Sequence, residues 1–437
     1  MLDRREKRNL LLFILSYLLN NLVSGILYDT YVNYLQEVSV GIATSFWAFY
    51  GYATFISAAM LLFVPRLGYR KLLLFCAVSC AASLFSVVLV PSESICYLAT
   101  LFSLVGVQMH FIMLSPYVAA YTGSLKDKSI DWYTRAYYTG YIGYFLTTYL
   151  GGVFTVKMFS LRAGIGYGEA KEITAYLSEA SQALRQAYIR GNEDVLLIVG
   201  GISLLAILPV LLMDERKEDY LEAQHEHKSF REKTGEVLSL LWNKDAVTYL
   251  VYWALISFAM GLFTSYFTVF LNRNLHMDKP TASLLVSISY LAIVIFMLFT
   301  PWCVRKMGKV GTDVFTVLMS VPFMLMIANG DRFGQAMVPM VGFALFMRSG
   351  FANLGSPADS DLMMTIAPKP LRPAYTALVN FVAGIISIIS GHFTGHVLFL
   401  QQEGYRQAYY LAAGLYILAA AILFIGLRKY NRTDAAS

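Results

Sequence analysis

The chain has 437 residues, of which 57% are hydrophobic and only 14% are charged, and its formal net charge is +6. Soluble domains carry about 25% charged residues. This chain has too few charged residues to cover a surface in water, so most of its surface must face lipid. The basic residues stand in short runs between apolar stretches, a loop pattern that excludes a nucleic-acid-binding face.

Long apolar stretches predict an all-α membrane protein with twelve transmembrane helices, because one span needs about 20 apolar residues. Basic residues precede the first stretch and no small-residue cleavage site follows it, so we expect this stretch to remain as the first span. The expected spans are 9–36, 41–64, 71–91, 95–122, 131–157, 194–213, 246–272, 280–302, 310–329, 336–365, 371–398 and 405–428.

The loops predict orientation and domain organisation. Lys and Arg are concentrated in alternate loops, which places both termini in the cytoplasm of a bacterial cell with the chain in its inner membrane. The outer loop 158–193 shows apolar residues at helical spacing, and we expect an amphipathic insertion resting on the outer face. The cytoplasmic loop 214–245 separates an N-terminal six-helix bundle, 1–213, from a C-terminal one, 246–437.

The second half echoes the first at a near-constant offset, which is typical of parallel six-helix repeats. Corresponding segments include Arg66-Leu67-Gly68 with Lys306-Met307-Gly308, and Ser115-Pro116 with Ser356-Pro357. On these segments and on the loop from Pro65 to Lys71, the chain resembles the major facilitator superfamily over essentially its whole length. The resemblance implies alternating access, in which two rigid halves rock about a central solute site.

The same resemblance assigns a gating role to the loop between spans 2 and 3 and to its repeat. The gating residues are Arg66, Gly68, Arg70 and Lys71, with Lys306 and Gly308 in the second half. Glycine permits the tight turn between two close helix ends. Pro65 stands where the family usually has an aspartate that helps to lock the inward gate, so the chain departs from the pattern there.

A second motif bears on the kind of transporter. Proton-linked drug exporters of this superfamily carry Gly-Pro-x-x-Gly-Gly in span 5, whereas this chain keeps Gly151-Gly152 and lacks the Gly-Pro. This difference weakens the interpretation as an exporter without excluding it.

Charged side chains within spans are costly and should face a cavity or a partner. Arg348 lies near the midplane of span 10, where it either locks two helices in an ion pair or contacts an anionic substrate. Asp29 on span 1 either reaches the outer headgroups or carries a proton, and it is also a candidate partner of Arg348. Asp359 shares a face with Arg348 near the cytoplasmic end of its span, so it is either a gate charge or a coupling site. His110 is either a packed histidine or a proton-linked group.

Neutral polar groups complete the predicted solute site with Arg348 and His110; they are Asn20, Asn21, Tyr141, Tyr144, Ser257 and Asn380. The tyrosines on span 5 fit helix packing as well as binding of sugars or aromatic solutes. The four cysteines fit packing, and His392 and His396 lack a carboxylate that would favour metal binding. We therefore expect no metal and no cofactor.

The sequence predicts a proton-coupled secondary transporter, not an enzyme, that works as a monomer on a small polar organic solute. The solute would be anionic if Arg348 contacts it, and another coupling ion could replace the proton. The alternatives are a proton-antiporting multidrug or lipid exporter, and a transporter-like receptor or scaffold that moves nothing. The many costly polar groups within the spans disfavour a scaffold.

Overall fold

A computed structural model describes residues 3–61, 63–90, 92–122, 129–221, 241–366 and 372–431, and every regular element among them is helical. The chain falls into two compact units. We call residues 1–225 with 276–287 the N-terminal unit, and residues 226–275 with 288–437 the C-terminal unit. Most of the predicted inter-bundle loop 214–245 lies outside the described residues, and the predicted domain boundaries stay predictions.

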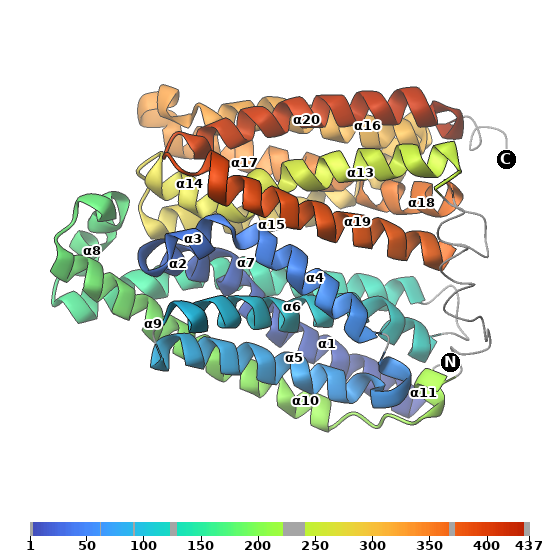
Figure 1. Ribbon diagram of the computed structural model, residues 1–437, viewed down its shortest axis with the longest axis horizontal. Helices are drawn as coiled ribbons and strands as arrows, with labels where there is room; N and C mark the ends of the chain where they lie inside the picture. Colours follow the sequence, from blue (N-terminus) through green and yellow to red (C-terminus); the bar gives the residue numbers. More distant parts are fainter. Residues whose placement is uncertain are drawn as a thin grey trace. The chain divides into compact units, whose positions relative to one another are not determined.

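The N-terminal unit consists of helices that run side by side in Figure 1, with α1 against α7, α5 against α6 and α9 against both α5 and α7. Its elements are α1 (Arg4–Ile26), η1 (Leu27–Tyr31), α2 (Val32–Val38), α3 (Val40–Thr44), α4 (Phe46–Leu61), α5 (Val64–Leu89), α6 (Glu93–Thr122), α7 (Ser129–Ala163), α8 (Tyr167–Ile173), η2 (Thr174–Glu179), α9 (Gln182–Leu205), α10 (Ile207–Leu211) and α11 (Glu218–Leu221). The first residues of α15 (Lys279–Met297) also belong to this unit.

The C-terminal unit is built around α13, which packs against α19 and α20, while α16 packs against α17 and α20. It also contains the remainder of α15. Its other elements are α13 (Lys244–Phe263), η4 (Thr264–Tyr266), α14 (Phe267–Arg273), α16 (Thr300–Ala328), η5 (Gly330–Ala336), α17 (Met337–Leu354), α18 (Ser356–Ile366), α19 (Arg372–Phe393), η7 (Thr394–Leu398), α20 (Gly404–Leu427) and η8 (Arg428–Asn431).

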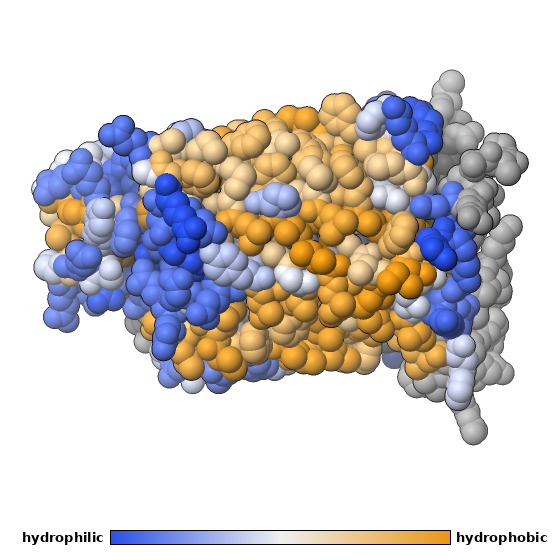
Figure 2. All heavy atoms as spheres, turned by 90° about the horizontal axis from the view of Figure 1, so that it is seen from above, coloured by the Kyte–Doolittle hydropathy of each residue, from blue (hydrophilic) through white to orange (hydrophobic). Residues whose placement is uncertain are grey.

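Ten helices in the described part of the chain are long and apolar enough to cross a membrane, and α4 is a shorter apolar helix. Figure 2 shows apolar side chains over the middle of the helices and polar side chains towards their ends. Large apolar residues such as Ile142, Phe154 and Phe102 are exposed on these helices. An exposed apolar band of this kind faces lipid in a membrane protein.

Both repeated glycines make the turn expected of them. Gly68 has φ 77° and ψ 167°, and Gly308 has φ 73° and ψ 174°, in a backbone region that is essentially restricted to glycine. After each turn a polar side chain accepts hydrogen bonds from backbone N–H groups. Glu215 accepts from Tyr69 and Arg70, and Asn431 accepts from Gly311. These acceptors satisfy N–H groups that have no partner within the helix.

The predicted outer insertion is not a single surface helix. α7 continues to Ala163 and α9 begins at Gln182, so two spans project beyond the boundaries at 157 and 194 that the sequence predicted. Together with α8 and η2 they enclose a small apolar cluster of Val156, Phe159, Ala170, Leu177 and Tyr188. The apolar residues at helical spacing in 173–188 therefore pack within this small cluster. Figure 1 shows the segment around the label α8.

Candidate functional site

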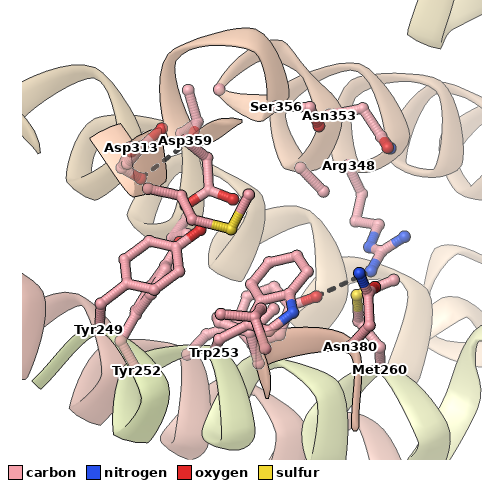
Figure 3. A pocket seen from close by; sticks show the side chains of 18 residues that line it. Tyr249, Tyr252, Trp253, Met260, Asp313, Arg348, Asn353, Ser356, Asp359 and Asn380 are labelled. Carbon is pink, nitrogen blue, oxygen red and sulfur yellow. Dashed lines mark hydrogen bonds between the residues drawn. The ribbon is translucent and has the colours of Figure 1, made fainter. Parts of the chain in front are cut away.

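A cavity of about 250 Å³ lies within the C-terminal unit. Helices α13, α16, α17, α18, α19 and α20 all contribute to its wall. Figure 3 shows Arg348 and Asn380 at one end, Asp313 and Asp359 at the other, and Trp253 between them. The cavity thus joins a cationic end to an acidic end.

Arg348, on α17, has only 4% of its surface exposed. Its Nη2 atom donates a hydrogen bond to the hydroxyl oxygen of Tyr416 at 3.1 Å, and its Cζ atom lies 4.5 Å from the ring centroid of Phe263. Its Nε atom is buried without a hydrogen-bond partner, and no carboxylate among the described residues forms an ion pair with it. A guanidinium stays charged in proteins, so this buried cation faces the cavity without a counter-charge in contact.

The acidic end combines Asp313 on α16 with Asp359 in the first turn of α18. Asp313 is 1% exposed, and its Oδ1 atom lies against Gly355, where a Cβ atom would come within 2.7 Å of it. Tyr249 lines the same end of the cavity (Figure 3). Asp313 Oδ2 and Asp359 Oδ1 are buried without a hydrogen-bond partner in the described structure. These oxygen atoms are available to a proton or to a donor on a bound molecule.

The structure brings together some predicted residues and separates others. Arg348, Asp359 and Asn380 line one cavity, whereas Ser257 is buried outside its lining. Sequence reasoning missed Asp313, because it follows a short basic loop and resembles a helix-end charge. It also did not single out Trp253 and Tyr416, since aromatic residues are common in spans.

The polar candidates of the N-terminal unit have packing partners. Asn21 donates from Nδ2 to the Tyr17 carbonyl oxygen at 2.7 Å, and it packs where Cβ atoms on Gly140 and Gly143 would meet it. Asn20 is 5% exposed, and its carbonyl accepts from Ser24. The Asn21 side chain therefore packs between α1 and α7.

His110 and the span-5 tyrosines lie among aromatic rings. The His110 ring lies 5.4 Å from that of Phe13, and its Nε2 atom is buried without a hydrogen-bond partner among the described residues. Tyr144 stacks on Tyr28 at 6.2 Å, while Tyr141 is partly buried. This arrangement suits packing.

Asp29 forms a buried ion pair with Lys279, whose Nζ atom lies 2.7 Å from its Oδ1 atom. Ser283 and Thr30 donate to the other carboxylate oxygen at 3.0 and 3.3 Å. The sequence placed Lys279 in an outer loop, but it is the first residue of α15 and is 1% exposed. Asp29 is therefore paired with a lysine of its own unit.

The gating residues differ in their surroundings. Arg66 and Lys71 are exposed, whereas Arg70 donates from Nη2 to the Leu211 carbonyl oxygen at 2.7 Å. Lys306 lies over the Trp302 ring at 4.9 Å. Within the N-terminal unit, Arg5 forms a two-pronged ion pair with Asp219 at 2.7 and 2.9 Å. Asp219, the acidic partner in this pair, lies after span 6.

In the described part of the chain, no group of three or more His, Cys, Asp or Glu side chains is placed to hold a metal ion. His396 directs its Nδ1 atom to the His392 carbonyl oxygen at 3.0 Å.

A family model described as Major Facilitator Superfamily matches residues 193–391. Solved structures with the same fold cover almost the whole chain. The nucleoside transporter NupG covers 96% of this chain and 100% of its own, at 16% identity and a TM-score of 0.73. The chain thus matches the Major Facilitator Superfamily model over residues 193–391 and shares the fold of these solved transporters over nearly its whole length.

Two other solved transporters share the fold with this chain. The xylose transporter XylE from E. coli, in a partially occluded inward-open conformation, is 14% identical over 97% of this chain and 98% of its own, with a TM-score of 0.66. A bacterial homologue of the human lysosomal transporter Spinster is 13% identical over 98% and 97%, with a TM-score of 0.68. No curated protein is similar enough to match the sequence. The fold and the apolar helices make this chain a multi-pass membrane protein.

Proposed function

We propose that this chain is a secondary active transporter that moves a small polar organic solute by alternating access, coupled to protons, in a bacterial inner membrane with both termini in the cytoplasm. The single observation that carries the proposal is Arg348, a buried cation that lines a cavity and has no ion-pair partner among the residues that the structure describes. A charge in such a place is costly, and it is retained where it serves a solute or ion pathway.

The solute-binding role rests on the chemistry around Arg348. Its free Nε atom and the neighbouring Asn380 can meet an anionic or hydroxyl-bearing group, and Trp253 offers a flat apolar face. NupG and XylE are described as nucleoside and xylose transporters. Those solutes are small, polar and organic, which supports a solute of this size and polarity here.

The proton-coupling role falls to Asp359 more than to the other two candidates. Asp359 lines the solute cavity and has a buried oxygen without a partner in the described structure. Asp29 is held by Lys279, and His110 lies against Phe13 and Tyr17. A group that exchanges protons during transport must reach the solute pathway, and Asp359 meets this condition.

A thermal-shift screen of the detergent-purified protein against small polar solutes tests the proposal. A ligand of the folded state raises the unfolding midpoint in a concentration-dependent way. We expect hits on the wild-type protein, a weaker shift with Arg348→Lys, which keeps the charge but loses the fork geometry, and no shift with Arg348→Ala. Equal shifts in all three proteins would remove Arg348 from the solute site.

A further inference from the structure

The cavity in the C-terminal unit has opposite charge chemistry at its two ends. Arg348 lines the cavity and is only 4% exposed, and its Nε atom is buried without a hydrogen-bond partner in the described structure. At the other end Asp313 and Asp359 line the same cavity, and each has a buried oxygen atom without a hydrogen-bond partner in the described structure. Figure 3 shows the two carboxylates side by side and well apart from the guanidinium. Neither end neutralises the other by direct contact.

The charges of the two ends can balance without an added ion. Two neighbouring carboxylates away from water resist double ionisation and tend to share one proton. Such a pair carries one negative charge, and Arg348 carries one positive charge. The empty cavity would then be neutral overall, so a bound solute of zero net charge would preserve that balance.

From this arrangement we infer that the transported solute is amphoteric: its anionic group binds Arg348, and its cationic group binds the Asp313–Asp359 end. The inference deepens the proposed transport function and rests on it. Charge-assisted hydrogen bonds at both ends would orient the solute in one direction.

The middle of the cavity suits the part of such a solute that joins its charged groups. Ile256, Met260, Val317 and Val379 give the cavity an apolar lining, and Trp253 lies between its two ends (Figure 3). Arg348 and Asp359 are eleven residues apart along α17 and α18, or about 16 Å along a helix axis before their side chains are considered. The two charged groups of the solute should therefore be separated by a chain of several carbon atoms.

Linear amino carboxylates are suitable probes, because 6-aminohexanoate carries both charges, whereas hexanoate and hexylamine carry one each. We would measure their binding to the purified full chain by thermal shift and by calorimetry, and extend the series to 4-aminobutanoate and 8-aminooctanoate to find the best length. The wild-type protein should bind the best amino carboxylate about tenfold or more tightly than the matching carboxylate, since one charge-assisted hydrogen bond is gained.

Two variants test the binding roles of the two ends of the cavity separately. The double variant Asp313→Asn with Asp359→Asn should lose the preference for the amino group and keep binding of hexanoate through Arg348. Arg348→Ala should lose hexanoate binding and weaken the amino carboxylate.

The outcomes distinguish this inference from the proposed function. If hexanoate binds wild type as tightly as the amino carboxylates, or if no amino carboxylate binds at all, the solute is not amphoteric in the proposed sense. Loss of hexanoate binding in Arg348→Ala would then still support a solute-binding Arg348. If Arg348→Ala binds every probe as wild type does, the assigned role of Arg348 is wrong and the inference fails with it.

Discussion

The Lys279 ammonium group lies 2.7 Å from the Asp29 carboxylate, and their side chains are 1% and 2% exposed. The two residues are 250 positions apart in the sequence. Ser283 comes from the same turn of α15 and donates to the second carboxylate oxygen. The first turns of α15 are thereby fastened to the π-helical segment of the first span.

Removing one member of this buried pair should destabilise the protein strongly. Asp29→Asn leaves the buried ammonium group of Lys279 without a counter-charge. Lys279→Met leaves the buried carboxylate of Asp29 without one. Each change should cost about 3–5 kcal/mol, because an unpaired buried charge keeps its full desolvation penalty. The measurement is the thermal unfolding midpoint of the purified protein in detergent.

The double variant Asp29→Asn with Lys279→Met should recover most of the lost stability, since no charge then remains buried. Arg162→Gln is the matched control, because it breaks an exposed pair with Asp194 and should cost about 1 kcal/mol or less. If the double variant is as unstable as the single ones, the buried charges are not the cause.

A second prediction concerns the turn at Gly308. Alanine there would adopt a backbone conformation that costs about 1–3 kcal/mol, and its Cβ atom would come within 2.5 Å of the Asn431 side-chain oxygen. Gly308→Ala should therefore lower the unfolding midpoint. Gly414→Ala, in α20, meets nothing within 4 Å and should be neutral or slightly stabilising. Similar behaviour of the two variants would argue against a conformational requirement at Gly308.

The pH dependence of stability should carry a contribution from Glu215. Burial raises the pKa of this carboxyl, and the hydrogen bonds from the Arg70 and Tyr69 N–H groups only partly oppose that effect. A carboxyl whose folded-state pKa is raised contributes stability at acidic pH, and this contribution is lost as the pH rises through the folded-state pKa.

Glu215→Gln keeps an oxygen acceptor and removes the titration. The difference in unfolding midpoint, wild type minus variant, should therefore fall as the pH is raised from about 4, the ordinary range of a glutamate. A difference that stays constant or grows with pH would contradict the buried, proton-retaining environment of Glu215.

Coupling should depend on Asp359. In reconstituted vesicles, Asp359→Asn should abolish accumulation driven by a proton gradient and spare exchange of solute across the membrane, because Asp313 keeps one negative charge in the cavity. His110→Phe is a control that preserves the aromatic packing with Phe13. If Asp359→Asn accumulates the solute normally, or if His110→Phe fails to accumulate it, the assignment of the coupling proton to Asp359 is wrong.

The sequence predicted the helices and the turns well, because both depend on local sequence: a helix on the length of its apolar stretch, and a tight turn on its glycine. The fold could also be predicted, since Gly68 and Gly308 mark the same place in two repeats. The site was harder to predict. Arg348 was found because a lone cation in an apolar run is conspicuous, but its cavity partners Asp313 and Tyr416 come from other helices. The partner of Asp29 could not be predicted, because Lys279 looks like an ordinary loop charge until α15 is placed.

The proton-coupled transport of a solute through the Arg348 cavity is tested most directly by reconstitution. Vesicles that contain the wild-type protein or Arg348→Ala would receive a mixture of small polar metabolites under an inward proton gradient, and their contents would be measured by mass spectrometry. We predict that at least one solute accumulates with the wild-type protein, is lost when a protonophore collapses the gradient, and does not accumulate with Arg348→Ala. Equal contents in both vesicle types, with or without the gradient, would contradict the account.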